Sequence, residues 1–570
     1  MWVSRAPTYN YPHFLLNFLY MSSLKFVALS GTTGVTENCY IYEYGDDMIV
    51  VDCGVGFPDA DMYGVDLVIP DFSYLRKNAH KLRAIVVTHG HEDHIGAIPF
   101  LLKEIKVPVY GSPLTAGFIK DKLMDYGIRD AKVHSFNLDT DVLNLGVFKI
   151  TPFRVSHSIP DAAGFCIDTP EGKVFHVPDY KFDWTPVSGK PFDVTKAALL
   201  ASSGVLAMAS DALGSTSPGY TESEQTVEDI IKKIVRDSKG LVYFTTISSN
   251  ISRMQQAIFA AEEAGRKVCF IGRSIIKKVE IARKLGYIKY PQHVVISGRD
   301  AKRIPRDKML YIISGSYGQP GSALYRVAMG EHDLLSVEEE DTVVFSADPA
   351  PPGAKFNVDF VVDRLLEENV DVHYYDMQEN LHVSGHGSME DIKMLIGLVQ
   401  PKFLIPIGGT IRHMRAYGKI AEMMGKKKNE VLELTGGETV EFSQGRVSRG
   451  ETIPVRQVLV DGLEVGDVGQ VVLRDRQILA SDGIAIVVMG FDTAQKKVVG
   501  DPEIISRGFV FEKMRKNFLT ESGSKLVKHL DKKRIVNTAV LKREAVDFLE
   551  RYFFEKTGRR PMILPVVAEE

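Results

Sequence analysis

The chain of 570 residues contains 45% hydrophobic and 25% charged residues, ordinary proportions for a globular protein that is too long for a single hydrophobic core. It has no apolar run of about eighteen residues, so no membrane-spanning helix is expected, and its four cysteines lack C-x-x-C spacing and indicate free thiols in a reducing compartment. The net charge of −4 excludes a strongly basic chain, so a polyanion partner would have to be recognised by local charge.

The first twenty residues contain a short apolar patch that Asn17 interrupts. Because this segment lacks the small-residue cleavage site of a secretory signal, we expect a cytoplasmic protein and interpret residues 1–20 as an extension of unknown role. Regular structure is expected from about Leu24, and Met21 is an alternative start.

A dense group of histidines and carboxylates follows a predicted buried strand. The apolar run AIVV leads directly into THGHEDH at residues 88–94. On a strand-to-helix turn, His89 and His91 can point to one side as ligands of a first metal ion, while Asp93 and His94 face a second. Imidazole together with carboxylate suits zinc, and manganese less closely. The alternative is a solvated loop without a metal.

Further candidate ligands follow other apolar runs. His157 lies in RVSHSIPDAAG, and Asp179 lies in HVPDYKFD. Each residue taken alone also has an ordinary structural interpretation. Asp52, at the end of IVVD, is expected to orient a ligating histidine through its other ring nitrogen.

Strands and helices alternate regularly in the middle of the chain, which predicts a parallel sheet covered on both faces. We assign residues 214–375 to this second domain. Helices are expected over 253–264 and 275–285, and strands over 241–247, 267–271, 309–314 and 342–346.

One part of this domain is strongly basic. Between Arg266 and Lys308, thirteen lysines and arginines stand against three acidic residues. Such clustering is typical of a surface that binds a polyanion, although a solvated basic face without a ligand is the alternative. Charge reversal among Lys277, Lys278, Lys302 and Arg303 is therefore expected to weaken binding of the polyanion and to flatten its salt dependence.

Histidine-rich motifs return after the second domain, which suggests that this domain is inserted within the first. Residues 376–442 would complete the first domain, and the polar stretch within 443–462 is interpreted as a linker. Residues 463–570, with IAIVVMGF, two predicted helices and MILPVV, suggest a small α+β domain.

Several motifs together resemble one known family. The order of Asp52, H-x-H-x-D-H, His157 and Asp179 is similar to that of the metallo-β-lactamase fold. The inserted domain, HVSGHGS at 382–388, GDVGQVVLRDRQIL and EIISRGFVF resemble the ribonuclease J family, a β-CASP group of metallo-β-lactamase nucleases. The resemblance covers nearly all of the chain from Leu24. It implies an α/β protein: a metallo-β-lactamase αββα sandwich (21–213 and 376–442), an inserted parallel-sheet β-CASP domain (214–375) and a C-terminal α+β domain.

The resemblance also implies roles for individual residues. His89, His91 and His157 would hold the first zinc, and Asp93, His94 and Asp179 the second, with Asp179 bridging. Catalytic roles would fall to Asp93 and to His382, a proton donor near the scissile phosphate. Ser249, His382 and Ser384 would bind a terminal 5′-phosphate. For His386 the motif leaves two interpretations open, a turn cap beside two glycines or a ligand.

One stretch departs from the family. Where relatives read P-V-H-G-E-Y-R-H, this chain reads PIGGTIRH at 406–413, so Gly408 stands at the position of a second-site ligand and Thr410 replaces an acidic residue. His413 matches a later histidine of the motif, and a metal role for it stays an alternative. We expect a second site with three protein ligands and lower metal affinity.

The leading hypothesis is a zinc-dependent ribonuclease that hydrolyses RNA phosphodiesters by two-metal-activated water, with 5′-to-3′ exonuclease and endonuclease activity in RNA maturation and decay, ribosomal RNA included. Its expected substrate is single-stranded RNA, preferably 5′-monophosphorylated, and its expected assembly is a homodimer or higher homo-oligomer, with no membrane association. Two alternatives remain: a catalytically weakened RNA-binding subunit that pairs with a paralogue, supported by Gly408, and a small-molecule metallo-hydrolase, which would not need the basic inserted domain.

Overall fold

The protein is described by a computed structural model that covers residues 22–59, 61–347, 354–375, 377, 380–462, 464–466, 469–510 and 515–569. The predicted extension at residues 1–20 lies outside this part of the chain. By its internal contacts the chain forms two compact units, one of residues 1–57 and 68–458 and the other of residues 58–67 and 459–570. Each unit is described separately.

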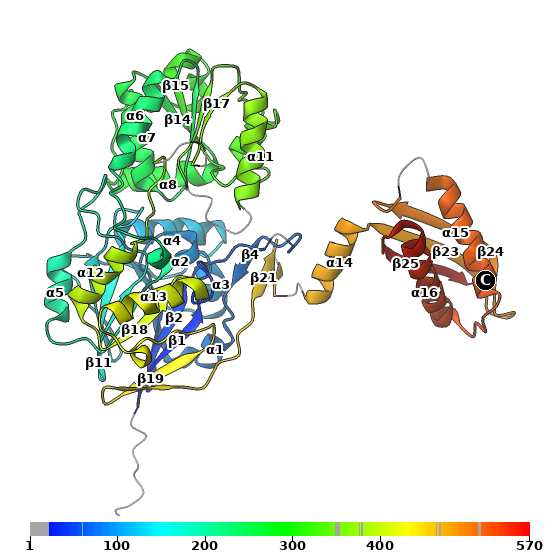
Figure 1. The fold of residues 1–570 in the computed structure, drawn as a ribbon, viewed down its shortest axis with the longest axis horizontal. Helices are drawn as coiled ribbons and strands as arrows, with labels where there is room; N and C mark the ends of the chain where they lie inside the picture. Colours follow the sequence, from blue (N-terminus) through cyan, green and yellow to red (C-terminus); the bar gives the residue numbers. More distant parts are fainter. Residues whose placement is uncertain are drawn as a thin grey trace, which may run out of the picture. The chain divides into compact units, whose positions relative to one another are not determined.

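Two sheets form the centre of the first unit (Figure 1). One has eight strands in the order β20-β19-β1-β2-β3-β5-β6-β7, and the other has six in the order β18-β12-β11-β10-β9-β8. Their bounds are β1 Leu24–Ser30, β2 Cys39–Tyr44, β3 Asp47–Val51, β5 Leu82–Val86, β6 Val109–Gly111, β7 Val133–Ser135, β8 Leu143–Leu145, β9 Phe148–Arg154, β10 Ala163–Thr169, β11 Gly172–Val177, β12 Ala207–Asp211, β18 Phe403–Ile407, β19 Thr439–Ser443 and β20 Arg446–Arg449.

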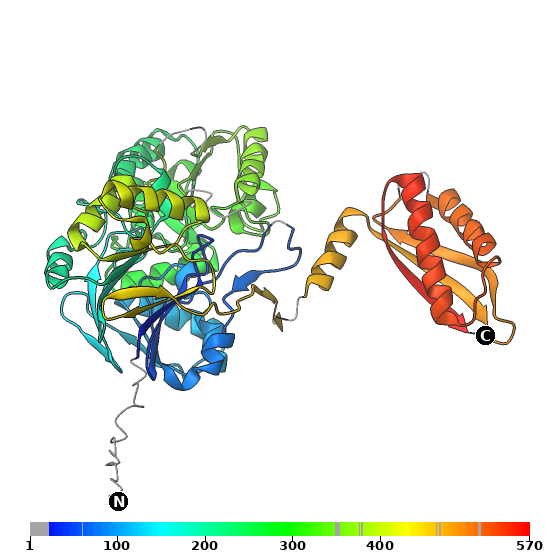
Figure 2. The same cartoon turned by 60° about the horizontal axis from the view of Figure 1, so that its bottom comes forward.

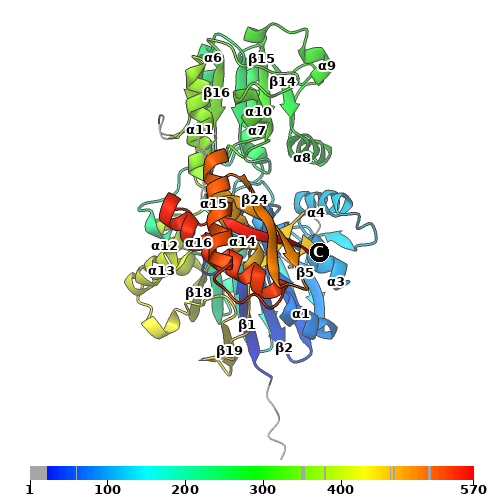
Figure 3. The ribbon, with the colours of Figure 1, turned by 90° about the vertical axis from the view of Figure 1, so that its right-hand side faces the viewer.

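A continuous hydrophobic core joins the two sheets. Phe26 and Tyr42 from the first sheet belong to the same buried cluster as Phe148, Phe165 and Ile405 from the second. Helices lie outside both sheets, so the layers are helix, sheet, sheet, helix (Figure 3). Their bounds are α1 Ser73–Lys77, α2 Glu92–Ile95, α3 Ile98–Glu104, α4 Pro113–Asp125, α5 Val194–Ala201, α12 Met389–Val399 and α13 Ile411–Met423. A short strand, β4, comprises Leu67–Ile69.

The inserted domain lies between β12 and β18. These two strands pair in parallel, with Ala207 opposite Phe403 and Asp211 opposite Ile407, although almost two hundred residues separate them in sequence. The chain therefore leaves the sandwich formed by the two sheets at the end of β12, forms a complete second domain and returns to the adjacent position in the same sheet. The predicted insertion agrees with this topology.

The inserted domain has a five-stranded sheet in the order β14-β15-β13-β16-β17, with every pair parallel. Its strands are short apolar runs, which is expected where helices cover both faces of a parallel sheet. The bounds are β13 Val242–Thr245, β14 Lys267–Ile271, β15 Met309–Ile313, β16 Thr342–Phe345, β17 Asp371–His373, α6 Thr226–Asp237, α7 Ile251–Glu263, α8 Arg273–Lys284, α9 Gly298–Ala301, α10 Ala323–Ala328 and α11 Ala354–Glu367. The predicted helices and strands differ from these bounds by a few residues at most.

Helix α8 packs against α4 of the sandwich, which connects the two domains of the first unit. Nζ of Lys277 lies close to the carboxylates of Asp121 and Asp125, at 3.5 and 2.5 Å. Nζ of Lys278 lies 3.3 Å from Oε1 of Glu92, in the helix that carries the histidine motif. Part of the basic stretch is therefore used to hold the inserted domain against the sandwich.

The second unit contains a three-stranded sheet in the order β24-β23-β25. Alternate residues of β23 are buried, because α15 and α16 cover one face of the sheet (Figure 2). The bounds are α14 Gln470–Ser481, β23 Ile484–Asp492, β24 Lys497–Arg507, α15 Arg515–Leu530, α16 Thr538–Thr557 and β25 Met562–Glu569, preceded by the hairpin of β21 Val458–Asp461 and β22 Glu464–Val465. This is the α+β domain that the sequence predicts.

Two further observations bear on the predicted organisation. Residues 446–449, expected within a linker, form the edge strand β20, which pairs with β19 in the eight-stranded sheet. Among the helices that the structure describes, none is long and apolar enough to cross a membrane.

Candidate metal centre

The candidate residues come from loops at one edge of the two sheets, where several strands end. The histidine motif follows β5, Asp52 follows β3, His157 follows β9, and Asp179 follows β11. Because parallel and antiparallel neighbours end side by side here, residues that are far apart in sequence become neighbours in space. His89 and His94 are fully buried, Asp179 is 5% exposed and His157 is 8% exposed, whereas His91 and Asp93 are half-buried.

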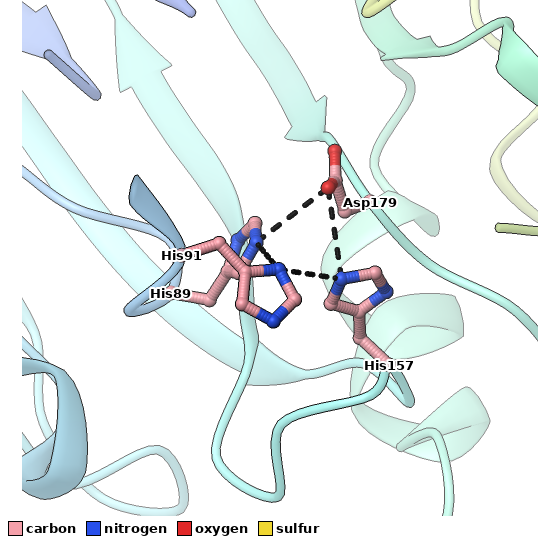
Figure 4. Close-up of side chains that lie close together, drawn as sticks. All are labelled: His89, His91, His157 and Asp179. Carbon is pink, nitrogen blue, oxygen red and sulfur yellow. Dashed lines mark hydrogen bonds and ion pairs between the residues drawn. The ribbon is translucent and has the colours of Figure 1, made fainter. Parts of the chain in front are cut away.

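Four side chains form the first group of metal-ligating atoms (Figure 4). Nδ1 of His91 lies 3.0 Å from Nε2 of His89 and 3.1 Å from Nε2 of His157. Oδ2 of Asp179 lies 3.5 Å from Nε2 of His89 and 3.6 Å from Nε2 of His157. Three imidazoles and a carboxylate with their ligating atoms turned toward one another are a zinc-type donor set.

A second group shares Asp179. Nε2 of His94 lies 3.3 Å from Oδ2 of Asp179 and 3.4 Å from Oδ2 of Asp93. The same carboxylate oxygen of Asp179 therefore faces both groups. This arrangement fits two adjacent metal ions that share one bridging carboxylate.

The remaining nitrogen of each of these rings is held by a neighbour, which fixes the orientation of the ring. Nδ1 of His94 lies 2.8 Å from Oδ2 of Asp52, and Nδ1 of His157 lies 2.7 Å from the carbonyl oxygen of Gly385. Asp52 is in turn fixed by Thr88, whose backbone N–H and hydroxyl both donate to its carboxylate at 2.8 Å. Asp52, which was predicted to orient a ligating histidine, thus contacts His94, a predicted ligand.

The protonation of the three histidines in the first group suits metal binding. Burial lowers the pKa of His91 and of His157 to about 3, and it lowers the pKa of His89 well below its usual value. These imidazoles are neutral at pH 7, the form that binds a metal. For Asp179, burial acts to raise the pKa, but His94 and its neighbours outweigh burial and hold that pKa well below its usual value.

Sequence reasoning missed Asp211, which lies at the edge of this site. Asp211 ends β12 and is 2% exposed, and its Oδ2 lies 2.7 Å from Nδ1 of His386. Nε2 of His386 then lies 3.9 Å from Oδ2 of Asp179, so Asp179, Asp211 and His386 form a third group of ligating atoms. The signal was present in the sequence, because Asp211 ends an apolar run as Asp52 and Asp179 do.

The predicted phosphate-binding residues lie in two separate loops. Ser249 is buried in the turn before α7, while Ser384 is exposed and its hydroxyl accepts a hydrogen bond from the backbone N–H of His386. His382 is half-buried, and its Nδ1 has no hydrogen-bond partner among the described residues. His386, rather than His382, is the histidine of this loop that lies against the metal-ligating groups.

Gly408 leaves an open position beside Asp211. Its backbone N–H donates to the carbonyl oxygen of Gly31 at 2.8 Å, and its φ of 69° lies in the left-handed region. A Cβ atom at this position would meet only Oδ1 of Asp211, at 3.4 Å. His413 does not fill the gap, because its Nδ1 accepts a hydrogen bond from the backbone N–H of Thr410 at 3.2 Å and caps α13.

Comparisons with known proteins identify the family. Three families match the sequence: the metallo-β-lactamase superfamily over residues 32–242, the ribonuclease J β-CASP domain over residues 239–365 and the ribonuclease J C-terminal domain over residues 471–570. Ribonuclease J2 of Bacillus subtilis strain 168 is 38% identical over 554 residues, which cover 96% of this chain and 99% of the relative. The chain belongs to the ribonuclease J family.

Other relatives have similar coverage. Ribonuclease J 1 of Streptococcus pyogenes serotype M3 is 36% identical, with 95% of this chain and 96% of the relative covered. Ribonuclease J 2 of Staphylococcus aureus strain MRSA252 is 33% identical, with 96% and 98% covered. A crystal structure of a protein of unknown function from Enterococcus faecalis V583 shares the fold, with a TM-score of 0.50 and 14% identity over 74% of this chain and 99% of that one.

Membership of the ribonuclease J family confirms the predicted family and the predicted fold class. Together with the buried histidine and aspartate groups, it confirms the predicted enzyme class, a metal-dependent hydrolase that acts as an RNA exo- and endonuclease. The small-molecule hydrolase alternative is therefore set aside.

Proposed function

We propose that this ribonuclease J family member cleaves RNA at a two-metal site whose ligands are His89, His91, His157 and Asp179 for one ion and Asp93, His94 and Asp179 for the other. One observation carries the proposal. A single oxygen of Asp179 lies 3.3–3.6 Å from ligating nitrogens of His89, His94 and His157, which belong to both groups.

Two bound ions would supply a hydroxide nucleophile at neutral pH and a counter-charge for the phosphodiester. The chain contributes a rigid ligand frame, because Asp52 and Gly385 fix the outer nitrogens of His94 and His157. Asp93 completes the second group, and its side chain is 24% exposed, against 6% for that of Asp179. Zinc is proposed for the first site, and zinc or manganese, held more weakly, for the second.

A proton donor for the leaving oxygen is the second requirement, and His386 fits it by position. Its Nδ1 is engaged by Asp211, which leaves Nε2 directed toward the metal-ligating groups. Burial acts to lower the pKa of His386, but the carboxylate of Asp211, which contacts its Nδ1, acts to raise it. The protonated ring can give its proton to an oxyanion. The proposed role of His382 is now limited to the 5′-phosphate, which it would bind together with Ser249 and Ser384.

The proposed substrate is single-stranded RNA with a 5′-monophosphate. Contacts to the phosphate backbone and stacking of bases tolerate many sequences, so little sequence preference is expected. We further propose a homodimer or higher homo-oligomer in the cytoplasm. A second candidate function, a weakened RNA-binding subunit that pairs with a paralogue, is favoured by one observation, the missing side chain at Gly408.

The test uses RNA labelled at a 5′-monophosphate and compares the wild type with His91→Ala and His80→Ala. His80 is an exposed histidine outside the site and serves as the matched control. We expect His91→Ala to abolish exonuclease and endonuclease cleavage, because it removes a ligand of the first metal ion. His80→Ala should cleave normally. If the wild type binds RNA but does not cleave it with either zinc or manganese, the weakened-subunit alternative is correct.

A further inference from the structure

Asn38 lies directly against the second group of metal-ligating atoms. This residue precedes β2 and is only 1% exposed. Its side-chain Nδ2 lies 3.1 Å from Nε2 of His94 and 3.3 Å from Oδ2 of Asp93. Nδ1 of His94 is already engaged by Asp52, so Nε2 is the nitrogen that is free for a metal.

The distances match those between ligands of one ion. Ligating atoms about 2.1 Å from a tetrahedral metal lie about 3.4 Å from one another. In the second group, Nε2 of His94 lies 3.4 Å from Oδ2 of Asp93 and 3.3 Å from Oδ2 of Asp179. The amide of Asn38 lies at similar distances from two of these atoms, 3.1 Å from Nε2 of His94 and 3.3 Å from Oδ2 of Asp93, so it stands where a fourth ligand would stand.

The hydrogen bonds of Tyr40 indicate which way the amide should face. The hydroxyl of Tyr40 lies 2.8 Å from the carbonyl oxygen of Gly31 and 2.8 Å from Oδ1 of Asn38. Its single proton cannot be donated to both oxygens. If the amide is turned by 180°, which its shape allows, Nδ2 donates to the Tyr40 oxygen, Tyr40 donates to Gly31, and the amide oxygen faces His94 and Asp93.

The turned amide has two costs, and a cation removes the second of them. It loses the contact from Nδ2 to the backbone carbonyl of Asp93 at 3.2 Å, although that carbonyl keeps the backbone N–H of Asn38 at 3.0 Å. It also places the amide oxygen beside the carboxylate of Asp93. Two oxygens at this distance repel each other unless a positive charge lies between them, so the orientation and metal binding support one another.

We propose that the side-chain oxygen of Asn38 is the fourth protein ligand of the second metal site and replaces the imidazole that Gly408 does not provide. The inference rests on the proposed two-metal function. Other candidates are less well placed. His413 caps α13, and His386 groups with Asp179 and Asp211 but not with Asp93 and His94.

The proposed ligand set changes the preference of the second site. Three oxygens and one imidazole favour a harder cation than a site with two imidazoles would. The ratio of manganese affinity to zinc affinity should therefore be higher at this second site than at a site that has histidine at position 408. The first site, with three imidazoles, should retain its preference for zinc.

The test measures Mn²⁺ binding to the second site after the first site has been filled with zinc, by electron paramagnetic resonance of free Mn²⁺. The variants are Asn38→Ala and Asn38→Asp, and bound zinc is the internal control for the fold. We expect Asn38→Ala to weaken Mn²⁺ binding at least about 10–100-fold. Asn38→Asp, which keeps an oxygen but cannot donate to Asp93 or Tyr40, should bind Mn²⁺ at least as tightly as the wild type.

A third variant separates the ligand role from a structural one. In Gly408→His combined with Asn38→Ala, the restored imidazole should recover most of the lost affinity, despite the strain of a histidine at φ 69°. If Asn38→Asp weakens Mn²⁺ binding as much as Asn38→Ala does, Asn38 acts only as a hydrogen-bond donor and the inference is wrong. If the wild type itself holds a single ion, the proposed two-metal function fails instead.

Discussion

At the scale of single residues, the site depends on small groups that fix the ligands. Gly385 is one of them, because its carbonyl accepts from His157 and a Cβ atom at this position would lie 2.5 Å from Cε1 of the same ring. Only glycine allows the loop to approach the imidazole this closely. Such contacts are invisible in a single sequence, where Gly385 reads as part of a turn.

We predict that Gly385→Ala lowers zinc affinity of the first site about 10–100-fold, because the methyl group must displace the ring of His157. Equilibrium dialysis against zinc measures the effect. Gly298→Ala is the matched control, since no atom lies within 4 Å of a Cβ at that position. Unchanged affinity in Gly385→Ala would mean that the ring is held by other contacts.

A buried carboxyl between the two domains predicts a dependence of stability on pH. Burial raises the pKa of Asp161 to about 6, although it accepts hydrogen bonds from the Leu114 N–H and the Tyr287 hydroxyl. The folded protein therefore favours the protonated form of Asp161, and the protonated carboxyl contributes to the stability of the fold. This contribution is complete below the pKa of Asp161 in the unfolded chain, about 4, and is lost as pH rises through about 6.

We therefore predict that Asp161→Asn becomes more stable relative to the wild type as pH rises from 4 to 8, by up to about 3 kcal/mol. The thermal unfolding midpoints of both proteins, measured across this pH range, give the difference. A difference that does not change with pH would show that Asp161 ionises freely in the folded state.

At the scale of elements, the fold divides the basic stretch that the sequence presents as one feature. Lys277 and Lys278 pair with Asp121, Asp125 and Glu92 of the sandwich. Lys302 lies near the first residues of β13 and β15, whereas Ser248 and Ser249 follow the end of β13. The expectation that all four named cations serve RNA binding alike is therefore revised.

Arg273 is better placed to contact RNA. It begins α8 and is exposed, and the hydroxyl of the next residue, Ser274, donates to Ser248 at 2.9 Å. We predict that Arg273→Ala weakens binding of 5′-monophosphorylated RNA and lowers the slope of log affinity against log salt by about 0.7, the value for one lost phosphate contact. Fluorescence anisotropy over a range of salt concentrations measures the slope.

Lys302→Ala is the matched control for Arg273→Ala, since it removes one exposed cation of the same domain at the other end of the strands. Its slope should equal that of the wild type. If instead Lys302→Ala lowers the slope and Arg273→Ala does not, RNA follows the opposite end of the inserted domain.

At the scale of the whole molecule, local patterns predicted the architecture well. Apolar runs of four or five residues indicated the parallel sheet, and histidine motifs on both sides of it indicated an insertion, which the pairing of β12 with β18 agrees with. The edge strand β20 was not predicted, because a polar edge strand resembles a linker in sequence.

The site was predictable only as far as its motifs extend. H-x-H-x-D-H, His157 and Asp179 were recognisable by their positions after apolar runs. Asp211 ends an apolar run as the predicted residues do, but its contact with His386 is tertiary. Asn38 lies against the candidate site through its contact with His94, and no spacing along the chain indicates that contact. The replacement of the family's histidine by Gly408 was visible in the sequence, but the neighbours of Gly408 in space could be known only from the fold.

The central claim is that Asp179 joins two metal ions in one site. Its most direct test is the number of ions bound per chain, measured by elemental mass spectrometry after dialysis against zinc and manganese, for the wild type, Asp179→Ala and the control His80→Ala. We predict two ions for the wild type and the control. Because Asp179 serves both groups, its loss should leave at most one weakly held ion and no RNA cleavage. Two firmly held ions in Asp179→Ala, or a single ion in an active wild type, would contradict the account.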